Sequence, residues 1–311
     1  MATTEFVQFP QVISVGCGID VHQQEVTATI GKGTNEFETR CFETYTESLE
    51  GLRDWCKESG VTHVAMESTG VYWKPVFNVL EEDFEVILVN ARHIKNVPGH
   101  KTDKKDSVWI TKLLLSGLLK GSFIPSVQMR ELRDLMRYRK KQVQQIASEK
   151  NRMIKILEDA NIKLSSVLTN VDGVTGQAIV NDLIDGNTDI DSLLKHVHGK
   201  VKASRDTIRK ALHGRLTSHH RFMLGTMRQS IADKEKIIQQ LDKHIDQITA
   251  TFKPEIELLQ SIDGIGKESA IAIISEIGTD MSQFPNEHHL SSWAGLSPGN
   301  NESAGKKKAH E

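Results

Sequence analysis

The chain has few cysteines, little net charge and no long apolar run, and each shortage excludes a class of protein. Only three cysteines occur among the 311 residues, and none lies in a Cys-x-x-Cys pair. An odd, scattered set argues against a disulfide framework or a structural zinc site and favours a reducing cytoplasm. No apolar run approaches the roughly 18 residues that span a bilayer. Residues 1–10 also lack the charged-then-apolar pattern of a signal peptide.

The net charge of -2 argues against a uniformly basic protein that coats nucleic acid. Positive charge is instead concentrated in two segments. Residues 92–105 hold five Lys or Arg against one Asp, and residues 128–155 hold nine Lys or Arg against three Asp or Glu. Such stripes suit a phosphate backbone. With 38% hydrophobic residues, a chain of this length has enough apolar side chains for two or three domains.

Strand and helix patterns alternate over residues 1–125, which predicts an α/β domain. Alternating apolar residues predict a strand pair within residues 12–30 and further strands at 61–66 and 84–89. Apolar residues at helical spacing predict helices at 48–57, 72–80 and 107–119. Asp20 and Glu67 then come at strand ends, and Asp106 comes where a helix starts.

Residues 126–253 predict a different architecture. Apolar residues alternate at four- and three-residue spacing from Leu132 to Ala160 and again from Leu224 to Phe252. Two long helices with this pattern can pack as an antiparallel hairpin or build a dimer. The polar segment between them, Asp172 to Ser218, contains five glycines and predicts short helices and loops at the hairpin tip.

Residues 254–311 predict a small, mainly helical third domain. Gly264-Ile265-Gly266 precedes an apolar helix at 269–277 and suits the hairpin of a helix-hairpin-helix unit, whose amides can face a phosphate. The alternative is an ordinary turn at a helix start. Further along, a Gly/Asn/Ser-rich loop places Ser303 close to Lys306 and Lys307. A serine beside cations can attack phosphorus, although turns favour serine for other reasons.

Four acidic residues form the candidate catalytic and metal-binding set, namely Asp20, Glu67, Asp103 and Asp106. Asp103 and Asp106 lie three apart, so a helix start would place both on one face. Carboxylates that converge in this way can hold two Mg²⁺ ions, and such a pair stabilises both the attacking and the leaving oxygen in phosphoryl transfer. Each residue alone could be a helix cap or a turn residue. As a set they lie within a basic frame that suits DNA, formed by Lys101, Lys104 and Lys105.

Six short strings agree in order and spacing with one known pattern. They are Gly18-Ile19-Asp20-Val21-His22, Met66-Glu67-Ser68-Thr69-Gly70, Lys101-Thr102-Asp103-Lys104-Lys105-Asp106, Asp263-Gly264-Ile265-Gly266, Ala294-Gly295-Leu296-Ser297-Pro298 and Ser303-Ala304-Gly305-Lys306. Together they resemble the motifs of the DEDD insertion-sequence transposases, the bridge-RNA-guided recombinases with a serine nucleophile. The resemblance extends over essentially the whole chain.

The resemblance implies a RuvC-like, ribonuclease-H-type domain for residues 1–125. It implies an antiparallel coiled coil with an inserted tip for residues 126–253 and a transposase domain for residues 254–311. The four acidic residues would bind Mg²⁺, and Ser303 would be the nucleophile. Members of this family continue beyond the last motif, so the resemblance also implies that the final domain is incomplete here.

The same resemblance implies the partners of the protein. A bridge RNA from the end of the insertion sequence would pair with donor and target DNA, so that base pairing chooses the sequence. Dimers would pair into a tetramer in which the acidic residues of one subunit meet the serine of another. We expect the protein in the cytoplasm, associated with the nucleoid.

The leading hypothesis from the sequence is a DNA recombinase in which Ser303 attacks a phosphate held at the acidic site. Basic residues expected to contact the nucleic-acid backbone are Lys101, Lys104, Lys105, Arg133, Arg137, Lys140, Lys141, Lys306 and Lys307. For those at 133–141 the alternative is a solvated coiled-coil face. Two other functions stay open: a Holliday-junction-type nuclease that uses water as the nucleophile, and an inactive scaffold that binds RNA or DNA. His22 lies two residues from Asp20 and could touch the site, but a surface or packing role is the leading expectation.

Overall fold

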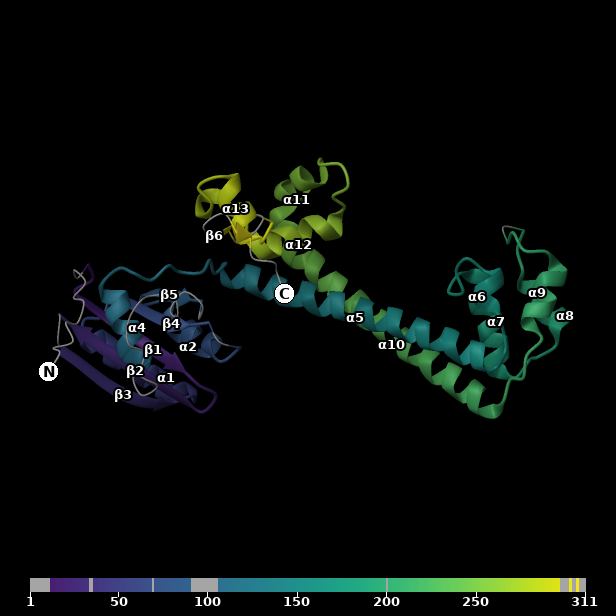
Figure 1. The fold of residues 1–311 in the computed structure, drawn as a ribbon, viewed down its shortest axis with the longest axis horizontal. Helices are drawn as coiled ribbons and strands as arrows, with labels where there is room; N and C mark the ends of the chain where they lie inside the picture. Colours follow the sequence, from purple (N-terminus) through teal and green to yellow (C-terminus); the bar gives the residue numbers. More distant parts are fainter. Residues whose placement is uncertain are drawn as a thin grey trace. The chain divides into compact units, whose positions relative to one another are not determined.

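The computed structural model describes residues 12–33, 36–68, 70–90, 106–199 and 201–296, together with the backbone of residues 302–303 and 306–307. The chain divides into two compact units, Met1–Ile124 and Pro125–Glu311. Figure 1 colours both along the sequence. In the parts of the chain that the structure describes, no helix combines the length and apolar composition needed to cross a bilayer.

A five-stranded sheet forms the centre of the first unit. Its strands are β1 (Val15–Val21), β2 (Glu25–Lys32), β3 (Glu36–Glu43), β4 (His63–Glu67) and β5 (Glu85–Val89). They lie in the order β3-β2-β1-β4-β5. β1 pairs antiparallel with β2, and β2 antiparallel with β3, whereas the pairs β1–β4 and β4–β5 are parallel.

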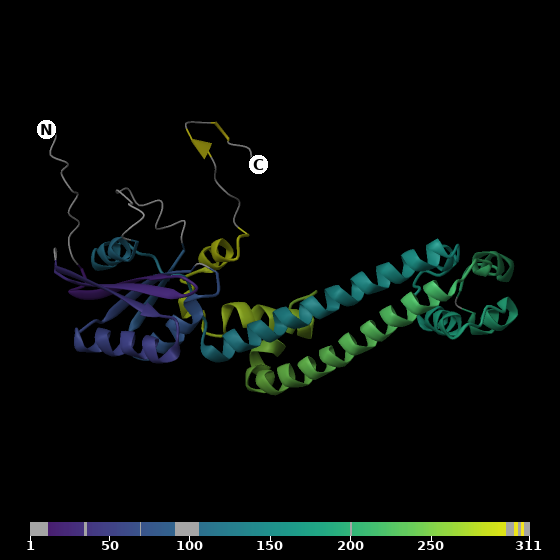
Figure 2. The same ribbon diagram turned by 90° about the horizontal axis from the view of Figure 1, so that it is seen from below.

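Helices cover both faces of this sheet. α1 (Thr46–Glu58) and α2 (Trp73–Leu80) pack on one face, and α4 (Asp106–Leu115) packs on the other. Figure 2 shows the three layers from the side. The α/β architecture expected from the sequence is therefore confirmed. Two details differ, because β3 was not expected and the helix expected to reach residue 119 ends at Leu115.

Two long helices form most of the second unit. α5 (Val127–Asp159) has 33 residues and α10 (Ser218–Thr249) has 32, so each is about 50 Å long. They lie side by side and antiparallel (Figures 1 and 2). One expected position on the α5 seam differs, since Val143 is 45% exposed whereas the neighbouring Gln142 is only 5% exposed.

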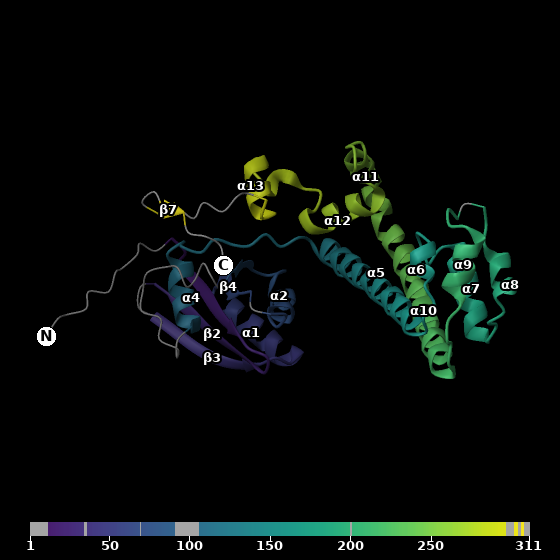
Figure 3. The same cartoon turned by 45° about the vertical axis from the view of Figure 1, so that its right-hand side comes forward.

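The segment between the two long helices folds into a compact tip. It contains α6 (Leu164–Val167), α7 (Val174–Asp185), α8 (Ile190–Leu193), the 3₁₀ helix η1 (Leu194–His196) and α9 (Arg205–Leu212). Figure 3 shows these helices gathered where α5 ends and α10 begins. Their buried apolar side chains share one core with the adjoining ends of α5 and α10.

The last part of the second unit is also helical. After the 3₁₀ helix η2 (Ala250–Phe252) come α11 (Lys253–Gln260), α12 (Lys267–Ile277), the 3₁₀ helix η3 (Met281–Gln283) and α13 (Glu287–Trp293). Two short strands follow, β6 (Glu302–Ser303) and β7 (Lys306–Lys307), which pair antiparallel. In the turn between α11 and α12, Gly264 has a φ of 90°, a conformation that favours glycine. Apolar side chains of α11 and α12 pack against α5 and α10.

Candidate acidic site

The pairing of β1 with β4 places Asp20 beside Glu67. Alternate residues of a strand point to opposite faces of the sheet. Cys17 and Ile19 belong to the core on the α1 side, so Asp20 faces the α4 side. Ala65 belongs to the core under α4, so Glu67 faces the same side. Because Ile19 is opposite Met66 in this parallel pair, the next residues on the two strands are Asp20 and Glu67.

Two glycines of β1 let α4 approach that face of the sheet closely. A Cβ on Gly18 would lie 2.4 Å from the Thr111 nitrogen and 2.6 Å from the Ser107 oxygen, both of them backbone atoms of α4. A Cβ on Gly16 would lie 2.9 Å from a methyl carbon of Leu114. The backbone of β1 and the helix are thus in direct contact, so no larger residue fits at Gly18 without moving α4.

Buried hydrogen bonds then fix α4 in place. Gly18 N donates to Thr111 Oγ1 at 3.0 Å, and that hydroxyl lies 2.9 Å from the Thr29 carbonyl oxygen. The hydroxyls of Thr29 and Ser107 share a hydrogen bond of 2.8 Å. Ser107 and Thr111 are one helical turn apart, so both contacts come from one face of α4. This arrangement positions Asp106, the first residue of the helix, at the sheet.

The three carboxylates are close enough to influence one another. Burial raises the pKa of the Asp20 carboxyl above its ordinary value. His22 opposes this rise, whereas the negative charges of Asp106 and Glu67 add to it. Asp20, Glu67 and Asp106 therefore form a cluster of like charge, and this cluster is called the acidic site below.

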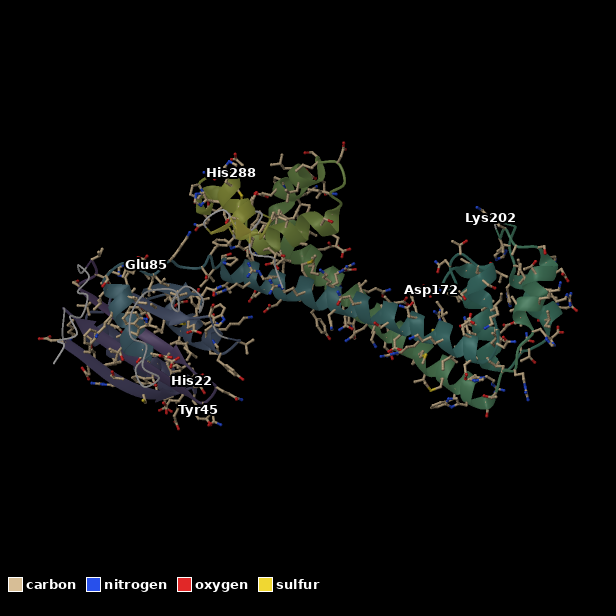
Figure 4. The ribbon with its side chains drawn as sticks, in the orientation of Figure 1. His22, Tyr45, Glu85, Asp172, Lys202 and His288 are labelled. Atoms are coloured by element: carbon tan, nitrogen blue, oxygen red, sulfur yellow. The ribbon has the colours of Figure 1, made fainter. Side chains whose placement is uncertain are left out.

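His22 contacts the acidic site, whereas the leading expectation from the sequence was a surface or packing role. Its backbone N–H donates to the Glu25 oxygen at 2.9 Å and closes the β1–β2 turn. The turn brings His22 Nε2 to 3.1 Å from Asp20 Oδ2, while 68% of the His22 side chain stays exposed. Figure 4 labels His22 near Tyr45 at this end of the unit. The ring is thus both a surface group and a neighbour of Asp20.

The donor set of the acidic site fits a hard divalent cation. Three carboxylates supply only oxygen ligands, which Mg²⁺ prefers, and a cation would offset their mutual repulsion. Within the described ranges, no group of three or more His, Cys, Asp or Glu side chains is arranged so that it could hold a metal ion. Asp103, the fourth expected ligand, lies outside the described residues, as do Lys101, Lys104 and Lys105.

Two of the arginines expected to bind nucleic acid contact α12 instead. Arg133 donates to the Ser275 and Glu276 carbonyl oxygens at 3.2 and 2.8 Å. Arg137 forms a bidentate pair with the Glu276 carboxylate, at 2.8 and 3.0 Å from its nitrogen Nη2. Cations at the C-terminal end of a helix satisfy its last carbonyls and favour its dipole. Both residues therefore hold α12 against α5, and a contact of either with nucleic acid stays a prediction.

For the remaining expected residues, the structure describes the side chains of the two lysines on α5 but only the backbone of the three residues in β6 and β7. Lys140 and Lys141 are exposed on α5. Ser303 lies in β6 opposite Lys306 in β7, and Lys307 lies opposite Glu302. The side chains of these four strand residues are outside the described part of the chain.

Two family models match the chain. A model of the DEDD transposases of IS110 type, described as "Transposase", matches residues 17–162. A second, described as "Transposase IS116/IS110/IS902 family", matches residues 256–311. The chain belongs to the IS110 family of transposases. No curated protein matches it.

Membership of this family makes the transposase an enzyme of DNA recombination. The first match contains the acidic site and continues through α5, and the second contains α12, α13 and Ser303. The two matched regions are therefore separated in the sequence by the tip and α10. A transposase binds DNA and acts on its phosphodiester bonds. The question for the acidic site is therefore whether it can take part in that reaction.

Proposed function

We propose that the acidic site, completed by Asp103, holds Mg²⁺ and that Ser303 is the nucleophile that cuts and rejoins DNA. The observation that carries the proposal is that two carboxylates, Glu67 and Asp106, lie near Asp20 in a chain of this family. The order Asp20, Glu67, Asp103, Asp106 also agrees with the letters of the DEDD name. Bound there, Mg²⁺ would supply Lewis acidity at the scissile phosphate.

The residues of the chain have separate tasks in this reaction. Asp20, Glu67 and Asp106 would hold the cation at the end of the sheet. The Ser303 oxygen attacks the phosphorus, and its proton passes to water or to a nearby base. A P–O bond of the DNA breaks, and the departing oxygen takes up a proton to become a hydroxyl. Attack of another DNA hydroxyl on the phosphoserine reverses these steps, so no external energy is needed.

A trapped protein–DNA adduct tests the serine. The transposase, end-labelled DNA, guide RNA and Mg²⁺ are mixed and denatured, and labelled DNA that migrates with the protein is measured. Ser303→Ala should abolish the adduct, whereas Ser291→Ala in α13, the matched control, should leave it unchanged. Strand cleavage without any adduct would instead favour the Holliday-junction-type nuclease. Binding without cleavage in Mg²⁺ would favour the scaffold.

The finer architecture belongs to the same proposal. The strand order β3-β2-β1-β4-β5, with acidic residues at the ends of β1 and β4, supports a RuvC-like, ribonuclease-H-type first domain. The antiparallel packing of α5 and α10 supports a coiled-coil middle domain. The turn at Gly264 between α11 and α12 supports a helix-hairpin-helix-like unit in the last domain.

We infer a composite site that two subunits share. The acidic site is in the first unit and Ser303 is in the second. We infer a dimer that pairs into a tetramer, in which one subunit supplies the carboxylates and another the serine. Mixing Asp20→Asn protein with Ser303→Ala protein should restore adduct formation that neither variant shows alone. If the mixture stays inactive while the wild type reacts, both halves come from one chain.

A bridge RNA is the proposed source of sequence choice. The exposed Lys140 and Lys141 on α5 offer positive charge to an RNA backbone without reading its sequence. Adduct formation should then require the RNA, and altering its pairing segment should redirect the reaction to the matching DNA. Equal reaction without any RNA would remove the guide from the proposal and leave the acidic site untouched.

A further inference from the structure

The tip region holds a cavity of about 260 Å³ between α5, α7, α10 and the loop before α7. Its floor is apolar, since Met153, Leu157 and Val180 are 9%, 2% and 3% exposed. Ile154 and Val171 are half-buried in its walls. Pockets for drug-sized ligands measure roughly 300–1,000 Å³, so this cavity suits a smaller group.

One wall of the cavity is polar and carries excess positive charge. The Asp172 carboxylate is ion-paired with Lys150, and its other oxygen is 4.0 Å from Arg228 Nη1. Gln177 Nε2 donates to the Asp172 carbonyl oxygen at 2.8 Å, and Gln177 Oε1 accepts from Arg228 Nη2 at 3.1 Å. Two cations thus face one carboxylate. Figure 4 marks Asp172 at this place, beside α5.

Two amide side chains on the cavity wall keep hydrogen-bonding groups for a ligand. Asn170 Oδ1 accepts from the Asp172 N–H at 2.9 Å, which leaves the NH₂ group of Asn170 for another partner. The Asn151 side chain forms no hydrogen bond with any residue that the structure describes. A primary amide offers both a donor and an acceptor in one plane. This is the pattern that pairs with the edge of a nucleobase.

We propose that the cavity binds one unpaired nucleotide. The base lies between the apolar side chains, the Asn151 and Asn170 amides bond to its edge, and Lys150 and Arg228 face its phosphate. Proteins that recognise single strands also bond to base edges and hold the backbone with cations, and in this cavity aliphatic side chains take the place of the aromatic stacking surface. The inference rests on the proposed function only in that the transposase handles nucleic acid. It adds a base-binding site in the second unit, on helices and a loop that lie mostly between the two matched regions.

The test measures how tightly the whole chain binds short, unstructured single strands of RNA and of DNA in the presence of a metal chelator. Ala147 lies on the cavity wall and is exposed on α5, so Ala147→Phe fills the cavity without entering the core. This variant should bind at least about tenfold more weakly, because the base can no longer enter the cavity. The control Lys236→Gln removes an exposed charge of α10 outside the cavity and should bind as the wild type does.

A photo-crosslink from a thiolated base identifies where the base lies. The proposal predicts crosslinked peptides from α5 around Asn151 and from the loop at residues 170–173, and it predicts their loss in Ala147→Phe. Should Ala147→Phe unfold, Asn151→Leu, at an exposed position, replaces it. Unchanged affinity in a folded variant, or crosslinks only outside these peptides, overturns the proposal. Stronger binding of RNA than of DNA identifies a 2′-hydroxyl contact, and equal binding identifies the base alone.

The two proposals fail separately. Binding is measured without metal, so it does not depend on strand cleavage. Asp20→Asn should lose the protein–DNA adduct and keep full binding at the cavity. Loss of binding in Asp20→Asn with normal binding in Ala147→Phe would instead place the single strand at the acidic site.

Discussion

The acidic site of the first unit and the contacts of Arg139 in the second unit use charge in opposite ways. In the first unit, Asp20, Glu67 and Asp106 bring charges of one sign together. In the second, Arg139 of α5 lies 2.5 Å from Asp242 of α10 and 2.7 Å from Glu268 of α12, so opposite charges are paired across three helices. Like charges oppose folding, whereas paired charges fix the position of elements. The paired charges therefore serve the assembly of the helices, whereas the repulsion among the carboxylates is what the proposed cation would offset.

The close contact of β1 with α4 gives the largest predicted effect. Gly18→Ala should destabilise the first unit by about 3 kcal/mol, at the upper end for overpacking, because the new Cβ meets backbone of α4. It should also displace Asp106 from Asp20. Urea unfolding followed by hydrogen exchange in β1 and α4 measures both effects. Gly51→Ala within α1 is the matched control, since a Cβ there meets nothing within 4 Å and should stabilise the helix slightly.

The second unit should respond less to loss of a single charge. Arg139→Ala removes the contacts with Asp242 and Glu268, but these carboxylates are 44% and 67% exposed and stay solvated. We expect a loss of about 1–2 kcal/mol in the unfolding free energy of α5 and α10. Lys236→Ala, which breaks an exposed pair with Asp233 within α10, should cost less than about 0.5 kcal/mol. Equal losses in unfolding free energy would show that a pair between helices stabilises the unit no more than a pair within one helix.

Individual residues show how much of the fold the sequence could predict. Asp20 and Glu67 could be placed at strand ends because apolar residues alternate before them. β3 could not be predicted, because only Phe37 and Phe42 of its eight residues are even half-buried, and pairing with β2 forms the strand. The predicted buried seam of α5 was wrong at Val143. A straight helix drifts about 20° per heptad from a strict seven-residue repeat, which brings Gln142 inward in its place.

The site itself was predictable in composition but not in geometry. The contact of His22 with Asp20 depends on how the β1–β2 turn closes, which no residue pattern specifies. Arg133 and Arg137 were read as part of a basic stripe, but Glu276, more than a hundred residues later, pairs with both. Local patterns contain no information about such distant partners.

The smallest predicted effect is a gain in stability rather than a loss, and it comes from Asp20→Asn. The pKa of Asp20 is raised on folding, so its protonated form favours the folded state. That contribution is complete at acid pH and is lost as the pH rises through the pKa of Asp20. Without metal at neutral pH, Asp20→Asn should therefore stabilise the first unit by up to about 1 kcal/mol. The gain should shrink toward zero in acid, as thermal unfolding at several pH values would show.

Asp54→Asn is the control for this prediction, because Asp54 is exposed on α1 and bonded to Arg53. It should give no gain at neutral pH. A destabilised Asp20→Asn protein at neutral pH would mean that the carboxylate serves the fold, contrary to the role we assign to the acidic site.

Binding of Mn²⁺, followed by its electron paramagnetic resonance signal, tests most directly whether the acidic site is a metal site. We expect the wild type to bind Mn²⁺ and Mg²⁺ to displace it. Asp20→Asn and Glu67→Gln should each weaken binding by at least about tenfold, or about 1.4 kcal/mol. The exposed-site variant Asp54→Asn should bind normally. Equal Mn²⁺ affinity in all four proteins would contradict the account.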